Sequence, residues 1–449
     1  MHRKTFLSLG ILWCATVSAF YTSAAFAQSA DRERPRPEDF GSSLKRLKWD
    51  SQKKIAVDAR RKSEGGKGSD EEDLVRVETS LVVSDFLVLD PQGRPVQGLT
   101  RGDFAVSEDD KPQQIGVFAP GDDDAVPRSV VFVIDASSEQ SGFVRTSIEA
   151  AKSLVDGLGP RDRMAVVTDE IKLLTDFTQD RRELKEKLDS LARRLARSAP
   201  SGRADSSPRG AHYSALLATL NELFADTDRR PVIIFQANGN EASLLQNSIV
   251  GPIEPPADLP RAEREKWLEF ARRERQWTQA HLKEFSLDDV YRAAERSPRA
   301  TIYTVIPGLR LLGLPPDEQA RRAKEWTLRS VTGIEDAKAA DRSEVRRHVE
   351  SEPEWLWKEK ADALLREQTA LAVLSRITGG WTEFLEEPSQ AVEIYSRILS
   401  DVNSRYVVGY YPSNKAHDGT RRRIKIEVRG HPEYGVLGRT SYIAPPPEQ

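Results

Sequence analysis

Five consecutive apolar residues, residues 130–134 (VVFVI), are followed directly by an acid, Asp135, and then by Ala-Ser-Ser-Glu. An uninterrupted apolar run of this length is typical of a strand that is buried on both faces of a parallel sheet. The carboxyl ends of such strands form the edge at which open α/β sheets bind ligands. Carboxylate and hydroxyl oxygens are the hard donors that Mg²⁺ prefers. The run therefore predicts a cation-assisted binding site at the edge of a sheet.

Strand and helix patterns alternate after this run. Leucines between the second and third predicted strands recur at spacings of four and three, which gives one apolar helical stripe. Strands that alternate with helices predict a doubly wound, mostly parallel α/β sheet with helices on both faces. The predicted strands are residues 130–135, 163–168, 231–236 and 301–306.

Both flanks of this α/β region have β-strand patterns. In residues 74–126, apolar and polar side chains alternate on both sides of residues 109–112, which predicts a hairpin. In residues 404–449, two similar segments flank the turn signal Asp418-Gly419, which predicts a second hairpin. Because two strands alone are marginally stable, we expect the two flanks to join in one small β-rich module.

Residues 1–27 have the pattern of a secretory signal peptide. A basic start precedes an apolar stretch, and the small residues near Ala27 fit cleavage before Gln28. The single cysteine, Cys14, lies in this segment, so the mature chain would contain no disulfide. An uncleaved anchor is the alternative, because residues 5–27 are almost long enough to span a membrane. The chain is therefore expected to be secreted or periplasmic.

Three further segments differ from the α/β region, which we place at residues 127–403. Residues 28–73 are rich in charged residues, Gly and Pro, which predicts a disordered leader with a short helix at residues 44–49. Residues 252–282 and 310–362 appear as insertions that are highly charged, carry tryptophans and are expected to form amphipathic helices. These helices either pack on the flank of the domain or present a groove to a partner.

These features together resemble the von Willebrand factor A-like proteins that bacteria secrete, in the subfamily with β segments on both sides of the A domain. The resemblance covers roughly residues 75–443 apart from the two insertions. It rests on segments that include DPQGRPVQGLTRGDFAVSEDDKPQQI, VVFVIDASSE, RRPVIIFQANGNEAS, LSRITGGWTEF and SRYVVGYYPSN. It implies an A-type α/β domain with a flanking β module, and a protein-binding function of the adhesion type.

The resemblance also implies a metal-ion-dependent adhesion site, which this chain carries in a degenerate form. The first loop of such a site reads Asp-x-Ser-x-Ser, a second loop supplies a Thr, and a third supplies an Asp. Here Asp135 and Ser137 match the first loop, but Glu139 replaces its last Ser. His212 stands near the expected Thr, and Asn238 replaces the expected Asp. The candidate metal ligands are therefore Asp135, Ser137, Glu139, His212 and Asn238.

Each candidate also has a purely structural interpretation. Asp135 and Ser137 are equally suited to cap the helix that follows. Glu139 is a direct ligand, a carboxylate that fills the open coordination position, or a solvated loop acid. His212 is alone among scattered histidines, and Asn238 before a glycine is a common turn pair. If an ion binds, Mg²⁺ or another divalent cation is expected, and the alternative is a chain without any metal.

Two functions follow from these interpretations. The first is a secreted module that binds another protein or peptide, with or without the cation. The second is a metal-independent structural or assembly scaffold of the cell envelope. An enzyme is not expected, because the sequence contains no Gly-x-Ser-x-Gly elbow, phosphate-binding loop or His-Glu-x-x-His. The net charge of −3 gives no reason to expect nucleic acid. Asp169 and Asp176 are interpreted as loop acids.

Overall fold

The computed structural model describes most of the chain after residue 80. The described residues are 40, 47–50, 55–58, 81–120, 126–137, 140–197, 211–224, 229–246, 248, 251–296, 300–332 and 339–445. The predicted signal peptide, residues 1–27, lies outside the described residues, as does most of the leader. No helix of the described part is long and apolar enough to cross a membrane.

A six-stranded sheet forms the centre of the α/β region, with the order β12-β11-β10-β7-β8-β9. Neighbouring strands are parallel except for β9, which pairs antiparallel with β8 at one edge. The predicted fold class, a doubly wound and mostly parallel sheet, is confirmed. The strands are β7 (Arg128–Ile134), β8 (Arg163–Thr168), β9 (Lys172–Thr178), β10 (Arg230–Gln236), β11 (Thr301–Pro307) and β12 (Thr382–Leu385).

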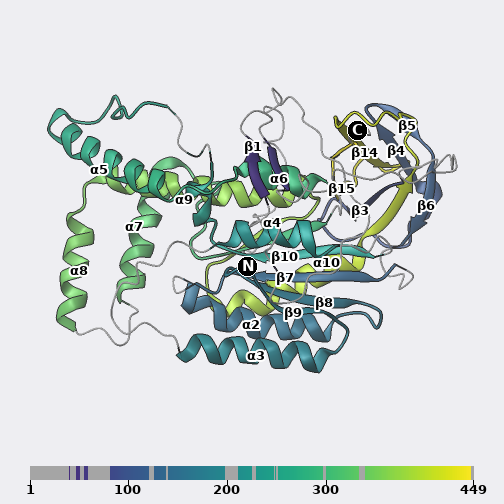
Figure 1. Ribbon diagram of the computed structural model, residues 1–449, viewed down its shortest axis with the longest axis horizontal. Helices are drawn as coiled ribbons and strands as arrows, with labels where there is room; N and C mark the ends of the chain where they lie inside the picture. The colour runs from purple at the N-terminus through teal and green to yellow at the C-terminus, as the bar shows by residue number, and fades with distance from the viewer. Residues whose placement is uncertain are drawn as a thin grey trace, which may run out of the picture.

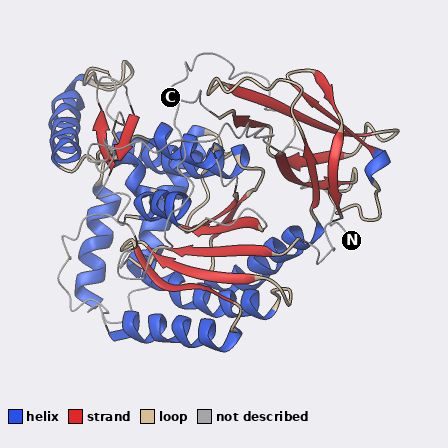
Figure 2. Cartoon of the chain, turned by 45° about the vertical axis from the view of Figure 1, so that its right-hand side comes forward, coloured by secondary structure: helices blue, strands red, loops and turns tan. Residues whose placement is uncertain are grey.

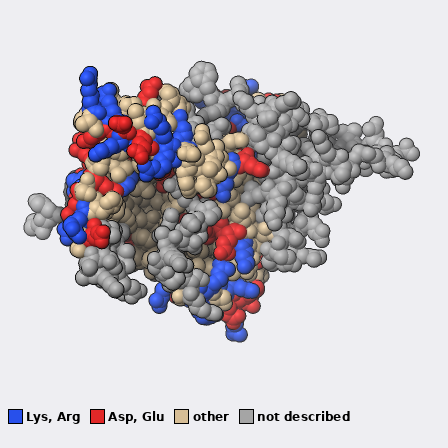
Figure 3. Space-filling model, turned by 60° about the vertical axis from the view of Figure 1, so that its left-hand side comes forward, with Lys and Arg blue, Asp and Glu red and all other residues tan. Residues whose placement is uncertain are grey.

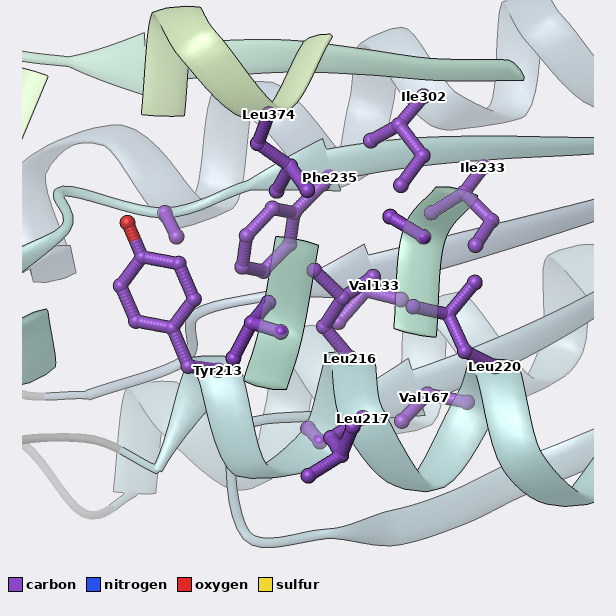
Figure 4. Packing of buried hydrophobic residues seen from close by; sticks show 14 of the residues in the cluster. Val133, Val167, Tyr213, Leu216, Leu217, Leu220, Ile233, Phe235, Ile302 and Leu374 are labelled. Atoms are coloured by element: carbon purple, nitrogen blue, oxygen red, sulfur yellow. The ribbon is translucent and has the colours of Figure 1, made fainter. Parts of the chain in front are cut away.

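Helices cover both faces of this sheet, which explains the uninterrupted apolar runs in its strands. Alternate residues point to opposite sides, so Val130 and Phe132 belong to one core and Val131 and Val133 to the other. Figure 4 shows Leu216 of α4 beside Val133 in the second of these cores. One face carries α2 (Ser141–Asp156), α3 (Arg181–Arg197) and α10 (Ala391–Ser404), and the other carries α4 (His212–Glu222), α6 (Leu287–Glu295) and α9 (Glu354–Ile377).

The two flanks of the chain form a β-sandwich that lies beside the α/β region (Figure 2). Its sheets have the orders β15-β3-β13-β6 and β16-β14-β4-β5. Aromatic rings from both flanks meet in the core of the sandwich, where Phe104 lies 5.1 Å from Phe86 and 5.3 Å from Tyr406 between ring centroids. The strands are β3 (Val82–Leu89), β4 (Phe104–Glu108), β5 (Lys111–Gln113), β6 (Ile115–Ala119), β13 (Tyr406–Tyr410), β14 (Arg421–Val428), β15 (Gly435–Gly438) and β16 (Ser441–Ile443).

Both hairpin predictions are wrong in their pairing. β4 pairs across Asp109-Asp110 with the short β5, and β6 lies in the opposite sheet. Asp109 and Asp110 both have positive φ, 46° and 65°, as a two-residue turn of type I′ requires. Likewise β13 and β14, on either side of Asp418-Gly419, lie in different sheets. The chain crosses between the two sheets after β5 and after β13, because the sandwich core has to be covered from both sides.

The leader also departs from the prediction at the residues that are described. β1 (Leu47–Asp50) pairs antiparallel with β2 (Ile55–Asp58), so the predicted helix at residues 44–49 is wrong over its second half. Apolar and polar residues alternate in Leu47–Asp50 (LKWD), which is the period of a strand and not of a helix, whereas Ile55–Asp58 (IAVD) is apolar up to its last residue. Phe40 is buried and belongs to the core on the α4 face.

The two predicted insertions contain helices that form an arm on the carboxyl side of the sheet (Figure 1). We use the term helical arm for α5 (Arg261–Ala280), α7 (Pro316–Thr332), α8 (Ala339–Ser351) and the first half of α9. Two small apolar clusters hold the arm together, one around Trp267 and Trp355 and one around Trp357. Neither cluster contains a residue from the six strands of the sheet. The arm therefore has cores of its own.

Buried charges join the sandwich to the amino-terminal edge of the sheet. Asp85 of β3 accepts a hydrogen bond from Thr301 of β11 at 2.8 Å. Burial raises the pKa of Asp85, but the nearby guanidinium groups of Arg405 and Arg230 outweigh it and hold that pKa below its usual value. Arg405 is fully buried and donates to Asp401 Oδ1 at 2.8 Å and to the Gly379 carbonyl at 2.7 Å. This joint depends on Arg405 being present and paired.

We predict that Arg405→Met lowers the free energy of unfolding by about 3–5 kcal/mol, because it leaves the buried Asp401 carboxylate without its ion pair. Chemical denaturation of the full chain measures the change. Arg397→Met is the matched control, since Arg397 lies on α10, which ends just before Arg405, is half exposed and pairs with Glu383. The control should change stability by no more than about 1 kcal/mol. Equal effects of the two substitutions would contradict a structural role for the buried charge.

Candidate functional site

The candidate site lies at the carboxyl edge of the sheet, where the strand order reverses between β7 and β10. Asp135 follows β7 directly, and its amide donates to the Gln236 carbonyl at the end of β10 at 2.9 Å. Asp135 Oδ1 accepts from the Ser137 amide at 3.0 Å. His212 begins α4, and its Nδ1 lies 3.9 Å from Asp135 Oδ2. The structure thus brings Asp135, Ser137 and His212 together.

Asn238 has the turn role that is typical of Asn before Gly. Its Oδ1 accepts from the Asn240 amide at 3.1 Å, and Gly239 has a φ of 86°. A Cβ atom at Gly239 would lie 2.9 Å from the Glu367 carbonyl of α9, so a larger residue does not fit. The loop after β10 is therefore packed closely beneath α9. Glu139, the remaining predicted ligand, lies outside the described residues.

Asp169 belongs to this site, although the sequence interpretation treats it as a loop acid. It is buried, and its Oδ1 accepts from the Ala136 amide at 2.9 Å. Burial, followed by the Asp135 carboxylate, raises the pKa of Asp169 to about 7. The order of the strands indicates its role. Because β8 is parallel to β7 and lies next to it, Asp169 after β8 and Asp135 after β7 lie at the same edge of the sheet. Asp176 lies within β9 and not in a loop.

His212 is a neutral side chain within an aromatic environment. Its ring centroid lies 5.0 Å from that of Tyr213 and 6.0 Å from that of Phe235, and no part of the residue is exposed. Burial is the main cause that lowers the pKa of His212 to about 4, while Glu241 acts to raise it. Within the described part of the chain, neither ring nitrogen has a hydrogen-bond partner. His212 therefore packs as an apolar ring at neutral pH.

The described donors do not fit a hard divalent cation. Mg²⁺ requires about six oxygens in octahedral arrangement. Oxygens of Asp135 and Asn238 accept backbone amides of their own loops, and His212 lies among rings. Ser137 Oγ is buried without a hydrogen-bond partner, but among the described residues no group of three or more His, Cys, Asp or Glu side chains could hold a metal ion. Among its described residues, which do not include Glu139, the edge has suitable residue types without a converging geometry.

Comparison with known proteins finds likeness only to solved structures. No protein-family model matches the chain, and no curated protein matches it. The vWF domain of the type V pili tip protein Mfa5 from Porphyromonas gingivalis is 13% identical, with a TM-score of 0.33, over 62% of this chain and 96% of that one. A von Willebrand factor type A protein from Catenulispora acidiphila is 13% identical, with a TM-score of 0.30, over 83% and 76%.

Proximal thread matrix protein 1 from the mussel byssus is 10% identical, with a TM-score of 0.27, over 63% of this chain. The likeness spans only 49% of the mussel protein. TM-scores and identities this low assign neither family nor function. The function is therefore argued below from the residues of this chain.

We predict that Asp169→Asn stabilises the protein at alkaline pH. The folded-state pKa of Asp169 is about 7, above the ordinary value of 3.8. Between these two values the unfolded chain ionises this carboxyl while the folded chain keeps it protonated, so the free energy of unfolding falls as pH rises from about 4 to 7. Asparagine is always neutral, and the expected gain above pH 8 is roughly 2–4 kcal/mol, with little gain near pH 4. Chemical denaturation at several pH values measures it, with the exposed neighbour change Glu170→Gln as control. A loss of stability at alkaline pH would show that Asp169 is held ionised.

We predict that His212→Phe removes a loss of stability that the wild type shows as pH falls below about 6.5. The folded-state pKa of about 4 lies below the ordinary 6.5, so the unfolded chain takes up a proton first as pH falls from about 6.5 to 4. The wild type loses roughly 2–3 kcal/mol over that range through this residue, and the phenylalanine variant does not. The difference between variant and wild type isolates this effect from that of Asp169, which has the opposite sign. The exposed His348→Gln should leave the pH dependence unchanged.

Proposed function

We propose that this protein is a secreted, non-catalytic module of the cell envelope that binds another protein through its helical arm and needs no divalent cation to do so. The observation that carries this proposal is the arm itself. Both insertions leave the carboxyl ends of adjacent parallel strands, β10 and β11, and build two apolar clusters that add nothing to the cores of the sheet. A scaffold for the sheet alone would not need them.

The arm is fixed firmly to the site edge. Gln368, in the second half of α9, accepts from the amides of Leu311 and Leu312 at 3.0 Å each and donates to the carbonyl of Leu309, whose side chain belongs to the cluster around Trp357, at 2.6 Å. Trp326 of α7 stacks on Phe143 of α2 with ring centroids 6.5 Å apart. These contacts support a preformed binding surface, because rigid elements lose little entropy when a partner binds.

The surface of the arm combines charge with a few exposed apolar side chains. Figure 3 shows basic and acidic residues intermixed on this side of the molecule, next to a recess where the visible described residues are other than Lys, Arg, Asp and Glu. At the end of α5, Trp277 is 36% and Leu282 is 38% exposed. Trp277 stacks on His281 with ring centroids 4.5 Å apart, and an exposed tryptophan of this kind is a typical anchor for a protein partner.

The alternative is adhesion through a cation at Asp135, as the sequence resemblance implies. The donor geometry gives that alternative less support, because Asn238 is engaged in its own turn and α9 packs over Gly239. Secretion rests on the signal pattern of residues 1–27, and the absence of catalysis on the sequence motifs discussed above. Each part of the proposal is thus open to a separate test.

We predict that Trp277→Ser combined with Leu282→Ser lowers capture of the partner by about tenfold or more, because both apolar anchors are removed. Cross-linking of the full chain in envelope extracts of its own source, with quantitative mass spectrometry, measures capture. Val392→Ser is the matched control, since Val392 is 50% exposed on α10, away from the arm. Capture should persist in a chelator. Loss of capture on chelation, or an equal loss with the control, would contradict the proposal.

A further inference from the structure

Helix α4 begins inside the protein without a capping residue of its own. Every residue of α4 except Asn221 is buried, so water does not satisfy the amides of its first turn. The N-cap residue is Ala211, whose side chain accepts no hydrogen bond. An acceptor for these amides must therefore come from another part of the chain.

Glu241, in the short 3₁₀ helix Asn240–Leu244 after β10, is that acceptor. Its Oε2 accepts from the Tyr213 amide at 2.5 Å and from the Ser214 amide at 3.3 Å. Its Oε1 accepts from Ser214 Oγ at 2.7 Å. One carboxylate therefore holds both the backbone and a side chain of the first turn of α4.

The carboxylate is fully buried, and burial of a charge is costly unless the charge is compensated. The positive end of the α4 dipole points at Glu241, and Lys283 Nζ lies 3.6 Å from Oε1. The Lys283 amide also donates to the Leu244 carbonyl at 2.7 Å, which fixes the end of the same 3₁₀ helix. Glu241 thus has compensation from both sides.

We infer that Glu241 supplies, from within the chain, the negative charge that ties the loop after β10 to the start of α4, so that this edge of the sheet is closed without an ion. In an adhesion site of the kind that the sequence resembles, the second and third loops would meet at the cation. Here the loop after β10 and the first turn of α4 meet at Glu241, while Asn238 turns back on its own loop. The inference goes beyond the proposed function, because it concerns the loops and not the partner.

The test compares Glu241→Gln and Ser214→Ala with the wild type in the full chain. Glu241→Gln should lower Tm by about 5–10 °C, and the milder Ser214→Ala by about 2–4 °C. In both variants, amide hydrogen exchange should accelerate together at residues 213–214 and at residues 238–244. The Tm of the wild type should be the same in a chelator and in Mg²⁺, Mn²⁺ or Ca²⁺. Glu284→Gln, an exposed acid beside Lys283, should have no effect.

Two results would overturn the inference. One is faster exchange at residues 213–214 with no change at residues 238–244, because Glu241 would then cap α4 without tying the loops together. The other is a wild-type Tm that rises with a divalent cation, because an ion would then share the joint. If Glu241→Gln does not fold, Ser214→Ala alone decides, since it removes one hydrogen bond and keeps the charge. Neither result depends on whether a protein partner binds the arm.

Discussion

Burial of both faces of the six-stranded sheet is the constraint on which the rest of the structure depends. With helices on each side, the strands carry apolar residues until they end, and polar side chains gather at their ends. Asp135 and Asp169 therefore lie at the same edge, and the insertions after β10 and β11 lie on that side too. The same constraint leaves few places where the chain can grow without disturbing its cores.

The sequence was sufficient to predict the class of fold and the position of the central strands, because runs of Val, Ile and Phe between amphipathic helices have few other solutions. It was not sufficient to predict which strands pair in the sandwich. The alternation in residues 104–118 shows two faces for each strand, but it does not show that β5 and β6 belong to opposite sheets. The strands 47–50 and 55–58 have only four residues each and lie in a charged segment, so the sequence pattern does not predict them.

Of the candidate site, too, the sequence predicts one part and not the other. Residue types placed Asp135, Ser137, His212 and Asn238 near one edge, but types alone do not give donor directions. His212 turned out to be packed between rings, and Asn238 to be bound in its own turn. Asp169 and Glu241 were missed because their importance depends on strand order and on the start of a neighbouring helix, neither of which local sequence reveals. Environment, more than composition, decides what these carboxylates do.

The order of strands in the sandwich also sets the sequence of events when the chain first folds. Among the described strands, the sheet neighbours of β3 are β13 and β15, which come more than three hundred residues later. The amino-terminal strands therefore cannot complete their hydrogen bonds until almost the whole polypeptide has been delivered. Until the carboxyl-terminal segment has been made, β3 is an apolar strand with open edges, and such an edge favours aggregation during folding.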